Sequence, residues 1–402
     1  MSGETKIVMK APIHAATELS DISRPAAVKF VVLFGIVSLF SDFTYEGARS
    51  ITGPFLAVLG ASATVVGVVS GFGELIGYAL RLVSGYFSDK TRKYWTIVFL
   101  GYGMNLLAVP LLALAGHWPI AAGLIVAERM GKAIRTPARD VMLSCAADQI
   151  GRGWGFGLHQ ALDQLGAVLG PLVVAAVLQL RGGYETGFAI LLIPALIALS
   201  LLVMAAKLHP TPQNIGTTSV KLEGKGFSRR FWVYIVAVGI VAAAYADFPL
   251  IAFHFKKMSV VPDSSIPIFY AVAMAVDAAA ALLFGRIFDR IGFASLIVAV
   301  LFSSFFAPLV FLGGFYSSLV GMALWGVGMG AQSSVMRAAI AGLVPTNRLG
   351  FAFGTFNMAY GLFWFAGSAL MGLLYDVSLP ALIVFSVTAQ LISIPILLAA
   401  RR

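Results

Sequence analysis

The chain has 402 residues, of which 59% are hydrophobic and only 11% charged, and its mean hydropathy is +0.91. A soluble domain carries about 25% charged residues, so this composition excludes a soluble globular protein and favours one embedded in a bilayer. The net charge of +10 raises nucleic-acid binding as an alternative, but the bases fall in alternate short loops, which is the pattern of membrane proteins. The single cysteine, Cys145, excludes an intramolecular disulfide and a cysteine-cluster metal site.

Apolar sequence begins near Ala26, after a polar stretch of mixed charge that does not resemble a cleavable signal peptide. At about 20 residues per span, the rest of the chain accommodates about twelve helices. Helices are expected because the alternating pattern of a membrane barrel is absent. The predicted segments are 27–58, 63–87, 94–115, 119–141, 154–180, 187–206, 230–254, 264–287, 294–314, 317–343, 350–374 and 380–399.

A stretch rich in proline, glycine and charge, from His209 to Ser228, divides these segments into two sets of six. Its composition is typical of a flexible loop. We therefore predict a cytoplasmic tail at 1–26, a six-helix bundle at 27–207, a cytoplasmic linker at 208–229 and a second six-helix bundle at 230–400.

The distribution of the basic residues indicates how the chain is oriented in the membrane. They gather on one side of the predicted spans, the side that also holds both termini, whereas the opposite turns near Ser62 and Tyr316 carry no charge. Lys256, Lys257 and Arg181 are exceptions on that opposite side. The positive-inside rule then predicts an integral protein of the plasma membrane, the inner membrane in a bacterium, with both termini in the cytoplasm.

One charged motif occurs twice, at equivalent places in the two halves. The first copy is Gly85-Tyr-Phe-Ser-Asp89-Lys90-Thr-Arg92-Lys93, and the second is Gly285-Arg-Ile-Phe-Asp289-Arg290-Ile-Gly-Phe293. A glycine, an aromatic residue and an aspartate followed by a base recur in register. The repeat predicts an internally duplicated membrane protein whose charged breaks join consecutive helices.

With this motif, the chain resembles the major facilitator superfamily of secondary transporters. Gly85-x-x-x-Asp89-Lys90-x-x-Lys93 is similar to the signature between helices two and three of that family, although Thr91 and Arg92 stand where glycine is usual. The resemblance implies an all-α fold of twelve transmembrane helices in two pseudo-symmetric bundles, with a central cavity and alternating access. It also implies a transporter rather than an enzyme, with no cofactor, and we expect a monomer.

Two further stretches resemble motifs of the same family. Gly166-x-x-x-Gly170-Pro171 is similar to part of the antiporter motif of helix five, but Val173 and Val174 replace the paired glycines that follow. This resemblance implies export by exchange. Arg129 lies where the family has an arginine motif in helix four, with a shorter spacing to the next glycine.

Ionisable residues inside the spans are candidates for the transport site, because each costs several kcal/mol unless paired or hydrated. Asp42, Glu46 and Arg49 share one face of the first segment. The two acids are candidates for taking up and releasing a proton, and a structural ion pair between Glu46 and Arg49 is the alternative. His159 and Asp163, one turn apart, form either a proton relay or a satisfied polar pair.

The remaining candidates are spread over five segments. Glu128 and Arg129 are expected in the cavity, whereas Arg135, Arg139 and Asp140 fit better as gating charges at the cytoplasmic surface. Glu74 and Arg81 share a face of segment two. Other intramembrane candidates are Asp247, Asp277 and Arg337. The aromatic cluster in segments ten and eleven either lines an amphiphile cavity or, more commonly, packs in the core or against lipid.

No phosphate-binding loop, His-Glu-x-x-His zinc motif or nucleophile elbow is present, so neither ATP hydrolysis nor a metal centre is predicted. The function we expect is secondary transport of a small solute, coupled to protons and directed outward. Two alternatives stay open: uptake or exchange of an organic or inorganic ion, including a metal cation, and a sensor or assembly protein that retains the fold without transporting. The expected partners are the bilayer, the solute and protons, and no nucleic acid.

The duplicated motif is expected to act as a conformational latch. Asp89 could cap the start of a helix in the other bundle or pair with Arg139, and the starts of the fifth and eleventh segments are the natural receivers. The predicted latch residues are Gly85, Asp89, Lys90, Arg92, Lys93, Arg139, Asp140, Gly285, Asp289 and Arg290.

Overall fold

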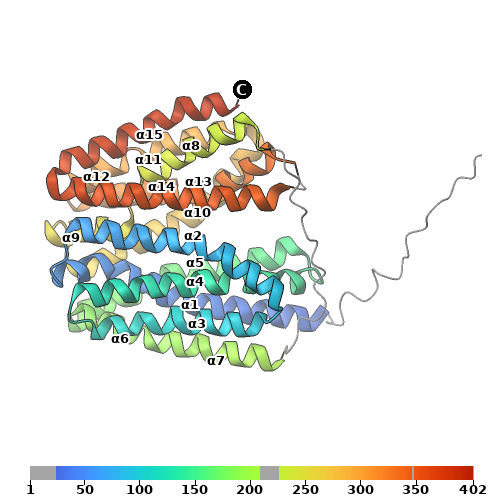
Figure 1. Cartoon of the computed structure of the whole chain (residues 1–402). Helices are drawn as coiled ribbons and strands as arrows, with labels where there is room; N and C mark the ends of the chain where they lie inside the picture. Colours follow the sequence, from blue (N-terminus) through green and yellow to red (C-terminus); the bar gives the residue numbers. More distant parts are fainter. Residues whose placement is uncertain (1–23, 209–225, 346–347, 402) are drawn as a thin grey trace, which may run out of the picture.

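The computed structural model describes residues 24–208, 226–345 and 348–401, and within these ranges every regular element is a helix (Figure 1). The predicted tail at 1–26 and linker at 208–229 fall largely outside the described residues, so these domain boundaries stay predictions. The elements are α1 (Arg24–Val58), α2 (Ala63–Thr91), α3 (Tyr94–Leu111), η2 (Leu112–Leu114), α4 (Trp118–Ala147), α5 (Arg152–Arg181), α6 (Tyr184–Ile190), α7 (Leu192–Leu208), α8 (Arg229–Ala243), α9 (Phe248–Lys257), η3 (Asp263–Ser265), α10 (Ile266–Ile291), α11 (Ala294–Ser303), α12 (Phe306–Phe311), α13 (Phe315–Leu343), α14 (Leu349–Val377) and α15 (Leu379–Arg401).

The twelve predicted segments all appear as helices. Five of the spans consist of two elements each, namely α3 with η2, α6 with α7, α8 with α9, η3 with α10 and α11 with α12. Eleven spans among the described residues are long and apolar enough to cross a membrane. The remaining one is α4, which lies between two of these spans and is more polar because it carries Glu128, Arg129, Lys132, Arg135, Arg139 and Asp140.

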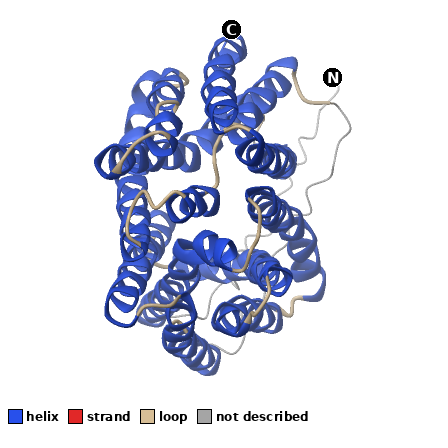
Figure 2. Cartoon of the chain, turned by 90° about the vertical axis from the view of Figure 1, so that its left-hand side faces the viewer, coloured by secondary structure: helices blue, strands red, loops and turns tan. Residues whose placement is uncertain are grey.

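The helices fall into an N-terminal group, α1 to α7, and a C-terminal group, α8 to α15. In the first group α1 packs on α5 and α4 packs on α2 and α3; in the second, α10 packs on α13 and α15 on α8. The most extensive contacts between the groups are those of α2 with α14, α1 with α9 and α5 with α10. In Figure 1 the C-terminal helices, yellow to red, lie mostly above the N-terminal helices, blue to green, and Figure 2 shows the helices nearly end-on. We call the side where α1 begins the terminus side and the opposite side the far side.

Glycines allow α3 and α4 to approach each other closely. A Cβ atom on Gly131 of α4 would overlap the backbone of Asn105 in α3, and one on Gly101 would lie 2.6 Å from the backbone nitrogen of Arg135. Small residues at helix contacts are typical of membrane helices, which gain much of their association energy from close packing. This contact brings the charged face of α4 against α3.

The two copies of the charged motif form helix ends rather than the hydrophilic breaks that the sequence suggests. Helix α2 continues through Asp89 to Thr91, and α10 continues through Asp289 to Ile291. The residue after each helix has a positive φ, +56° at Arg92 and +58° at Gly292, and its N–H bonds the carbonyl four residues earlier. Arg92 therefore takes the left-handed conformation that usually favours glycine at the end of a helix. The helix ends at this motif although no glycine stands there.

We predict that Gly131→Ala destabilises the protein by about 1–3 kcal/mol, because the added methyl group overpacks the contact between α3 and α4. Gly123→Ala on the same helix is the matched control, since a Cβ there meets nothing within 4 Å. The free energy of unfolding of the purified protein in detergent measures both. Equal stability of the two variants would show that α3 and α4 are not tightly packed there.

Candidate functional site

A connected set of ion pairs lies within the N-terminal group, at the middle of its helices. Arg49 of α1 donates a hydrogen bond to Glu74 of α2 and lies 3.8 Å from Glu46. Arg129 of α4 contacts both Glu74, at 3.4 Å, and Glu128, at 3.3 Å. Lys132 lies 3.9 Å from Glu46. We call this set the ion network: Glu46, Arg49, Glu74, Glu128, Arg129 and Lys132.

Helical spacing and neutral donors hold the ion network in place. Glu46 and Arg49 are three residues apart, and Glu128 and Lys132 are four apart, so each pair shares a face. Asn105 of α3 donates a hydrogen bond of 2.7 Å to the Glu128 carboxylate, which the close approach of α3 and α4 permits. With three acids and three bases, the network is formally neutral, and a neutral set is far less costly to bury than a single ion.

Two polar contacts cross between the helix groups at this depth, and both come from α10. The Tyr270 hydroxyl donates a hydrogen bond of 2.5 Å to Glu46, and the Gln164 amide of α5 donates one of 3.3 Å to Asp277. Tyr270 and Asp277 are seven residues apart and so face the same way. Asp277 is 7% exposed and forms no ion pair within the described part of the chain.

His159 and Asp163 pair as expected, with the His159 Nδ1 atom 3.3 Å from the Asp163 carboxylate. The other ring nitrogen lies 2.9 Å from the Ser38 hydroxyl of α1. This order of contacts is that of a serine-hydrolase triad, but Ser38 is fully buried, so no substrate reaches its hydroxyl in this conformation. Nearby Asp42 is half-buried, forms no ion pair among the described residues, and is subject to the charges of Asp163, Lys132 and Arg135.

The charged residues of α4 nearest the terminus side form no ion pair with the ion network. Arg135 is 1% exposed and places its guanidinium carbon 4.0 Å from the centre of the Tyr102 ring. Arg139 bonds its neighbour Asp140, through two contacts of 2.8 and 2.9 Å, rather than Asp89.

The second-half candidates are more isolated. Asp247 is buried at the start of α9, and its Oδ2 atom has no hydrogen bond within the described ranges. Arg337 is exposed on membrane-spanning α13. Of the expected aromatic cluster, Trp325 lies in the core and donates a hydrogen bond to the Ala246 carbonyl. Tyr360 and Trp364 are also buried, with ring centres 5.6 Å apart, and Tyr360 packs across the groups against Tyr78.

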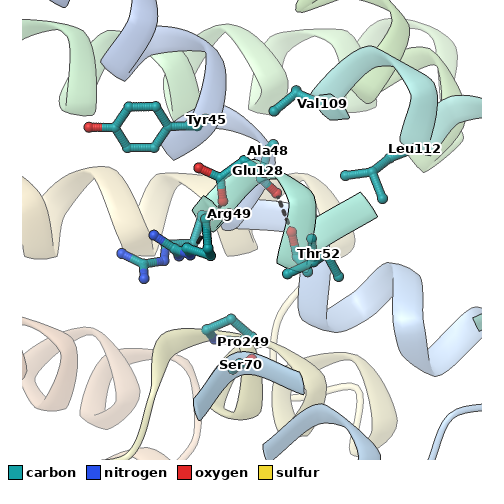
Figure 3. A pocket seen from close by; sticks show the side chains of 11 residues that line it. Tyr45, Ala48, Arg49, Thr52, Ser70, Val109, Leu112, Glu128 and Pro249 are labelled. Atoms are coloured by element: carbon teal, nitrogen blue, oxygen red, sulfur yellow. Dashed lines mark hydrogen bonds and ion pairs between the residues drawn. The ribbon is translucent and has the colours of Figure 1, made fainter. Parts of the chain in front are cut away.

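The far side of the ion network is closed. A pocket of ≈ 20 Å³ lies there, lined by Arg49, Glu128 and Arg129 together with Thr52, Ser70 and Pro249 (Figure 3). That volume is enough for about one water molecule. Beyond it, Gly53 of α1 packs directly on the Pro249 backbone of α9. A solute in this conformation therefore has no far-side route to the network.

A carboxylate joins the far-side ends of α2 and α14 through hydrogen bonds. Asp376, one residue before the end of α14, accepts hydrogen bonds from the backbone N–H groups of Ala63 and Thr64 at 3.2 and 2.8 Å. It also accepts one from the Thr64 hydroxyl at 2.7 Å. Asp376 thus caps the start of α2 from the other helix group, where the helix dipole favours an anion.

The predicted latch is open on the terminus side. Asp89, Lys90, Arg92 and Lys93 are exposed, as are Asp289 and Arg290, and Asp89 has no hydrogen bond or ion pair within the described ranges. Arg348, at the start of α14, provides no side-chain cap for that helix. A Cβ on Gly85 would make an ordinary contact of 3.6 Å with Pro137, and one on Gly285 would meet nothing within 4 Å.

The helix-five motif holds α5 against α1. A Cβ on Gly166 would overlap the Leu39 carbonyl, and one on Gly170 would overlap the Phe43 carbonyl. Pro171 follows within α5. The motif therefore sets the distance between two helices of one group and touches no residue of the ion network.

The residues predicted for the site do not include Tyr270, Gln164, Ser38 or Asp376, and Glu74 is predicted only to share a helix face with Arg81. For Glu74 the signal was available, because it is an acid inside a span on the same face as Arg81. Asp376 stands at a helix end, where an acid is ordinary. Tyr270, Gln164 and Ser38 are uncharged, so only the packing of the helices reveals that they contact charged groups.

We predict that Glu74→Gln destabilises the protein by about 3 kcal/mol, because Arg49 and Arg129 lose a buried partner. Adding Arg129→Gln should recover part of that loss, since the double variant again buries fewer unpaired charges. Unfolding of the purified protein in detergent measures the change, with Glu185→Gln, at an exposed site, as the control. Additive losses in the double variant would contradict a shared network.

Comparisons with known proteins agree with this architecture. The family model of the Major Facilitator Superfamily matches residues 34–368. The uncharacterized protein Rv2265 of Mycobacterium tuberculosis is 39% identical over 388 residues, covering 94% of this chain and 95% of the relative. The uncharacterized MFS-type transporter MJ1317 of Methanocaldococcus jannaschii is 27% identical and covers 87% and 89%. Among solved structures, a mutant of the nucleoside transporter NupG has a TM-score of 0.79 at 11% identity, covering 93% of this chain and all of that one. The chain belongs to the Major Facilitator Superfamily of membrane transporters.

Proposed function

We propose that this protein is a proton-coupled secondary transporter that moves a small solute by alternating access, exporting it in exchange for protons. Family membership supports secondary transport as such. The outward direction rests on the resemblance of Gly166 to Pro171 to the antiporter motif. The distribution of bases supports an inner-membrane protein with cytoplasmic termini, and the structure would then be closed to the outside.

The main support for proton coupling is the position of Asp277. Its carboxylate lies in membrane-spanning α10, nearly buried, with a neutral amide as its bonding partner. An ionised carboxylate at that depth without a cation costs several kcal/mol, and binding a proton removes this cost. Because Gln164 belongs to the other helix group, a change of charge at Asp277 also changes a contact that joins the groups.

Glu46 is a second acid whose contacts depend on the relative position of the two helix groups. It accepts a hydrogen bond from Tyr270 of the C-terminal group while it faces Arg49 and Lys132 in its own group. When the groups separate at this point, Glu46 loses the Tyr270 donor and keeps its cations. Glu46 and Asp277 therefore lie where proton binding and relative movement of the groups can influence each other.

A metal cation as the solute finds less support. Within the described ranges, no group of three or more His, Cys, Asp or Glu residues is placed to hold a metal ion. The carboxylates of the ion network are instead occupied by arginine and lysine. The proposal therefore favours an organic solute over a metal ion.

We predict that Asp277→Asn abolishes solute-driven proton movement and leaves exchange of the same solute across the membrane, because an amide cannot bind and release the proton. Proteoliposomes with an imposed pH gradient, an internal pH dye and a broad solute panel measure both activities. Asp263→Asn, in a surface ion pair with Lys256, is the control.

Proton movement that persists in Asp277→Asn would remove Asp277 from the mechanism. If no solute moved protons even with the unchanged protein, the coupled transporter would be rejected, and a member of the fold that senses without transporting would be favoured.

We further propose that Asp89 is the counterpart of Asp376 on the terminus side. The register of α2 and α14 supports this: Gly67 lies against Gly372, Gly71 against Ser368 and Tyr78 against Gly361. Continuing that register places Asp89 opposite the first turn of α14, which begins at Leu349. The cap would form when the terminus side closes, and the space beside Gly85 and Gly285 would then be used.

We predict opposite shifts from removing the two carboxylates. Asp376→Ala favours the conformation closed on the terminus side, and Asp89→Ala favours the one closed on the far side, each by about fivefold, since a helix cap is worth about 1 kcal/mol. Distances between spin labels at Lys207→Cys and Arg286→Cys, in a Cys145→Ser background, report the two populations. Shifts of the same sign would refute the paired caps.

A further inference from the structure

Among the described residues, the guanidinium groups of Arg81, Arg135 and Arg337 lie in membrane-spanning helices without a carboxylate partner, and Arg135 packs over the Tyr102 ring. Arg81 of α2 and Arg337 of α13 form no ion pair in the part of the chain that the structure describes, whereas Arg49, Arg129 and Arg139 each contact an acid. The Arg81 Nε atom is buried without a hydrogen bond. An unpaired cation inside a membrane is costly, and this applies most to the partly buried Arg81, since Arg337 is exposed.

An aromatic pair lies beside Arg81 and is linked by a hydrogen bond to the helix that carries Arg337. The guanidinium carbon of Arg81 lies 5.4 Å from the centre of the Tyr78 ring, and that ring meets Tyr360 of α14 edge-to-face at 5.7 Å. Tyr360 in turn donates a hydrogen bond to Gln332 of α13, and Arg337 lies five residues after Gln332 on the same helix. Arg81 therefore lies where an aromatic ring from each helix group meets, and Arg337 lies between one and two turns along α13 from the Gln332 side chain that binds this ring pair.

The free polar atoms around this point are hydrogen-bond donors. Gln332 of α13 is 7% exposed; its Oε1 atom accepts a hydrogen bond of 2.7 Å from the Tyr360 hydroxyl, and its Nε2 atom has no partner among the described residues. The nearby acid on the Arg81 face is Glu74, and Arg49 and Arg129 already occupy it. A set of unoccupied donors with two positive charges fits an anion.

We propose that Arg81, Arg337 and Gln332 bind the anionic group of the transported solute, and that the solute is an organic anion with a planar or aromatic part. Guanidinium groups match phosphate and carboxylate oxygens through two parallel hydrogen bonds. The Tyr78 and Tyr360 rings offer faces and edges for the planar part. One arginine comes from each helix group, so the bound anion links the groups. Transport of this anion rests on the proposed function, but its binding does not.

The headgroup of an anionic lipid carries the same chemistry, so the test separates the two sources. The purified protein is placed in nanodiscs of phosphatidylcholine alone, and binding of phenyl phosphate, benzoate and benzylamine is measured by calorimetry without any gradient. We expect at least one of the two anions to bind in the millimolar range or tighter, and the cation benzylamine not to bind. Adding anionic phosphatidylglycerol to the nanodiscs should leave this binding in place.

Arg81→Gln and Arg337→Gln should each weaken anion binding by about tenfold or more, because each removes charge-assisted hydrogen bonds. Gln332→Leu tests the neutral donor and should weaken it less. Arg286→Gln, an exposed base at the same end of the neighbouring helix α10, is the matched control and should bind like the unchanged protein. Each variant is checked for its unfolding midpoint, so that lost folding is not mistaken for lost binding.

Three results would overturn the proposal. They are preferred binding of benzylamine, anion binding that is absent or insensitive to both arginine substitutions, and full displacement of the anion by phosphatidylglycerol, which would assign the arginines to a lipid headgroup. If the anion binds through both arginines and yet no proton movement accompanies it in proteoliposomes, the anion site stands and proton coupling falls. The two proposals can therefore fail separately.

Discussion

The cost of placing an ion inside a membrane governs the arrangement of this transporter. Within the N-terminal group, three acids and three bases of α1, α2 and α4 contact one another. Asn105 donates a hydrogen bond to Glu128, and Lys132 lies over the Tyr45 ring. Such a set is stable only when complete, because removing one member leaves another ion unpaired. The ion network is therefore balanced in charge, whereas Asp42, Arg81 and Arg135 of the same group lie outside it.

The C-terminal group differs in this respect. Its intramembrane ions, Asp247, Asp277 and Arg337, form no ion pair with one another among the described residues. Each of them depends on something supplied from elsewhere, whether a donor from the other group, a proton or a bound solute. This asymmetry gives a physical reason for the groups to respond to what binds between them, since the unpaired ions of one group are satisfied only across the interface.

Much of the fold is predictable from the sequence, because length and apolar character alone define a helix that crosses a membrane. Even α4, the most polar span, keeps its place in the order of segments. The charged candidates are predictable for a related reason: an ionisable residue within a span is itself a signal. Their partners are not, because a contact such as that of Arg129 with Glu74 depends on how far one helix is shifted along another. The positions of Tyr270 and Gln164 carry no sequence signal at all, since both are neutral.

The duplicated motif illustrates the same limit. Its repeat in register is visible in the sequence, and Arg92 and Gly292 both have a positive φ, although their ψ angles differ, +14° and −136°. The expectation that it forms a charged break was wrong, because a helix continues through polar residues once it has left the apolar layer. Whether Asp89 reaches a receiver depends on the conformation of the whole protein, which local sequence does not encode.

The pairing of α2 with α14 has a mechanical consequence. Each helix has 29 residues and is thus roughly 43 Å long, and glycines allow the two to touch along much of that length. If they tilt against each other about their middle by about 10°, each end moves by roughly 4 Å. A hydrogen bond is lost well before such a displacement is complete. The three hydrogen bonds of Asp376 therefore survive small fluctuations in the tilt of the two helices, whereas a full tilt breaks all three together.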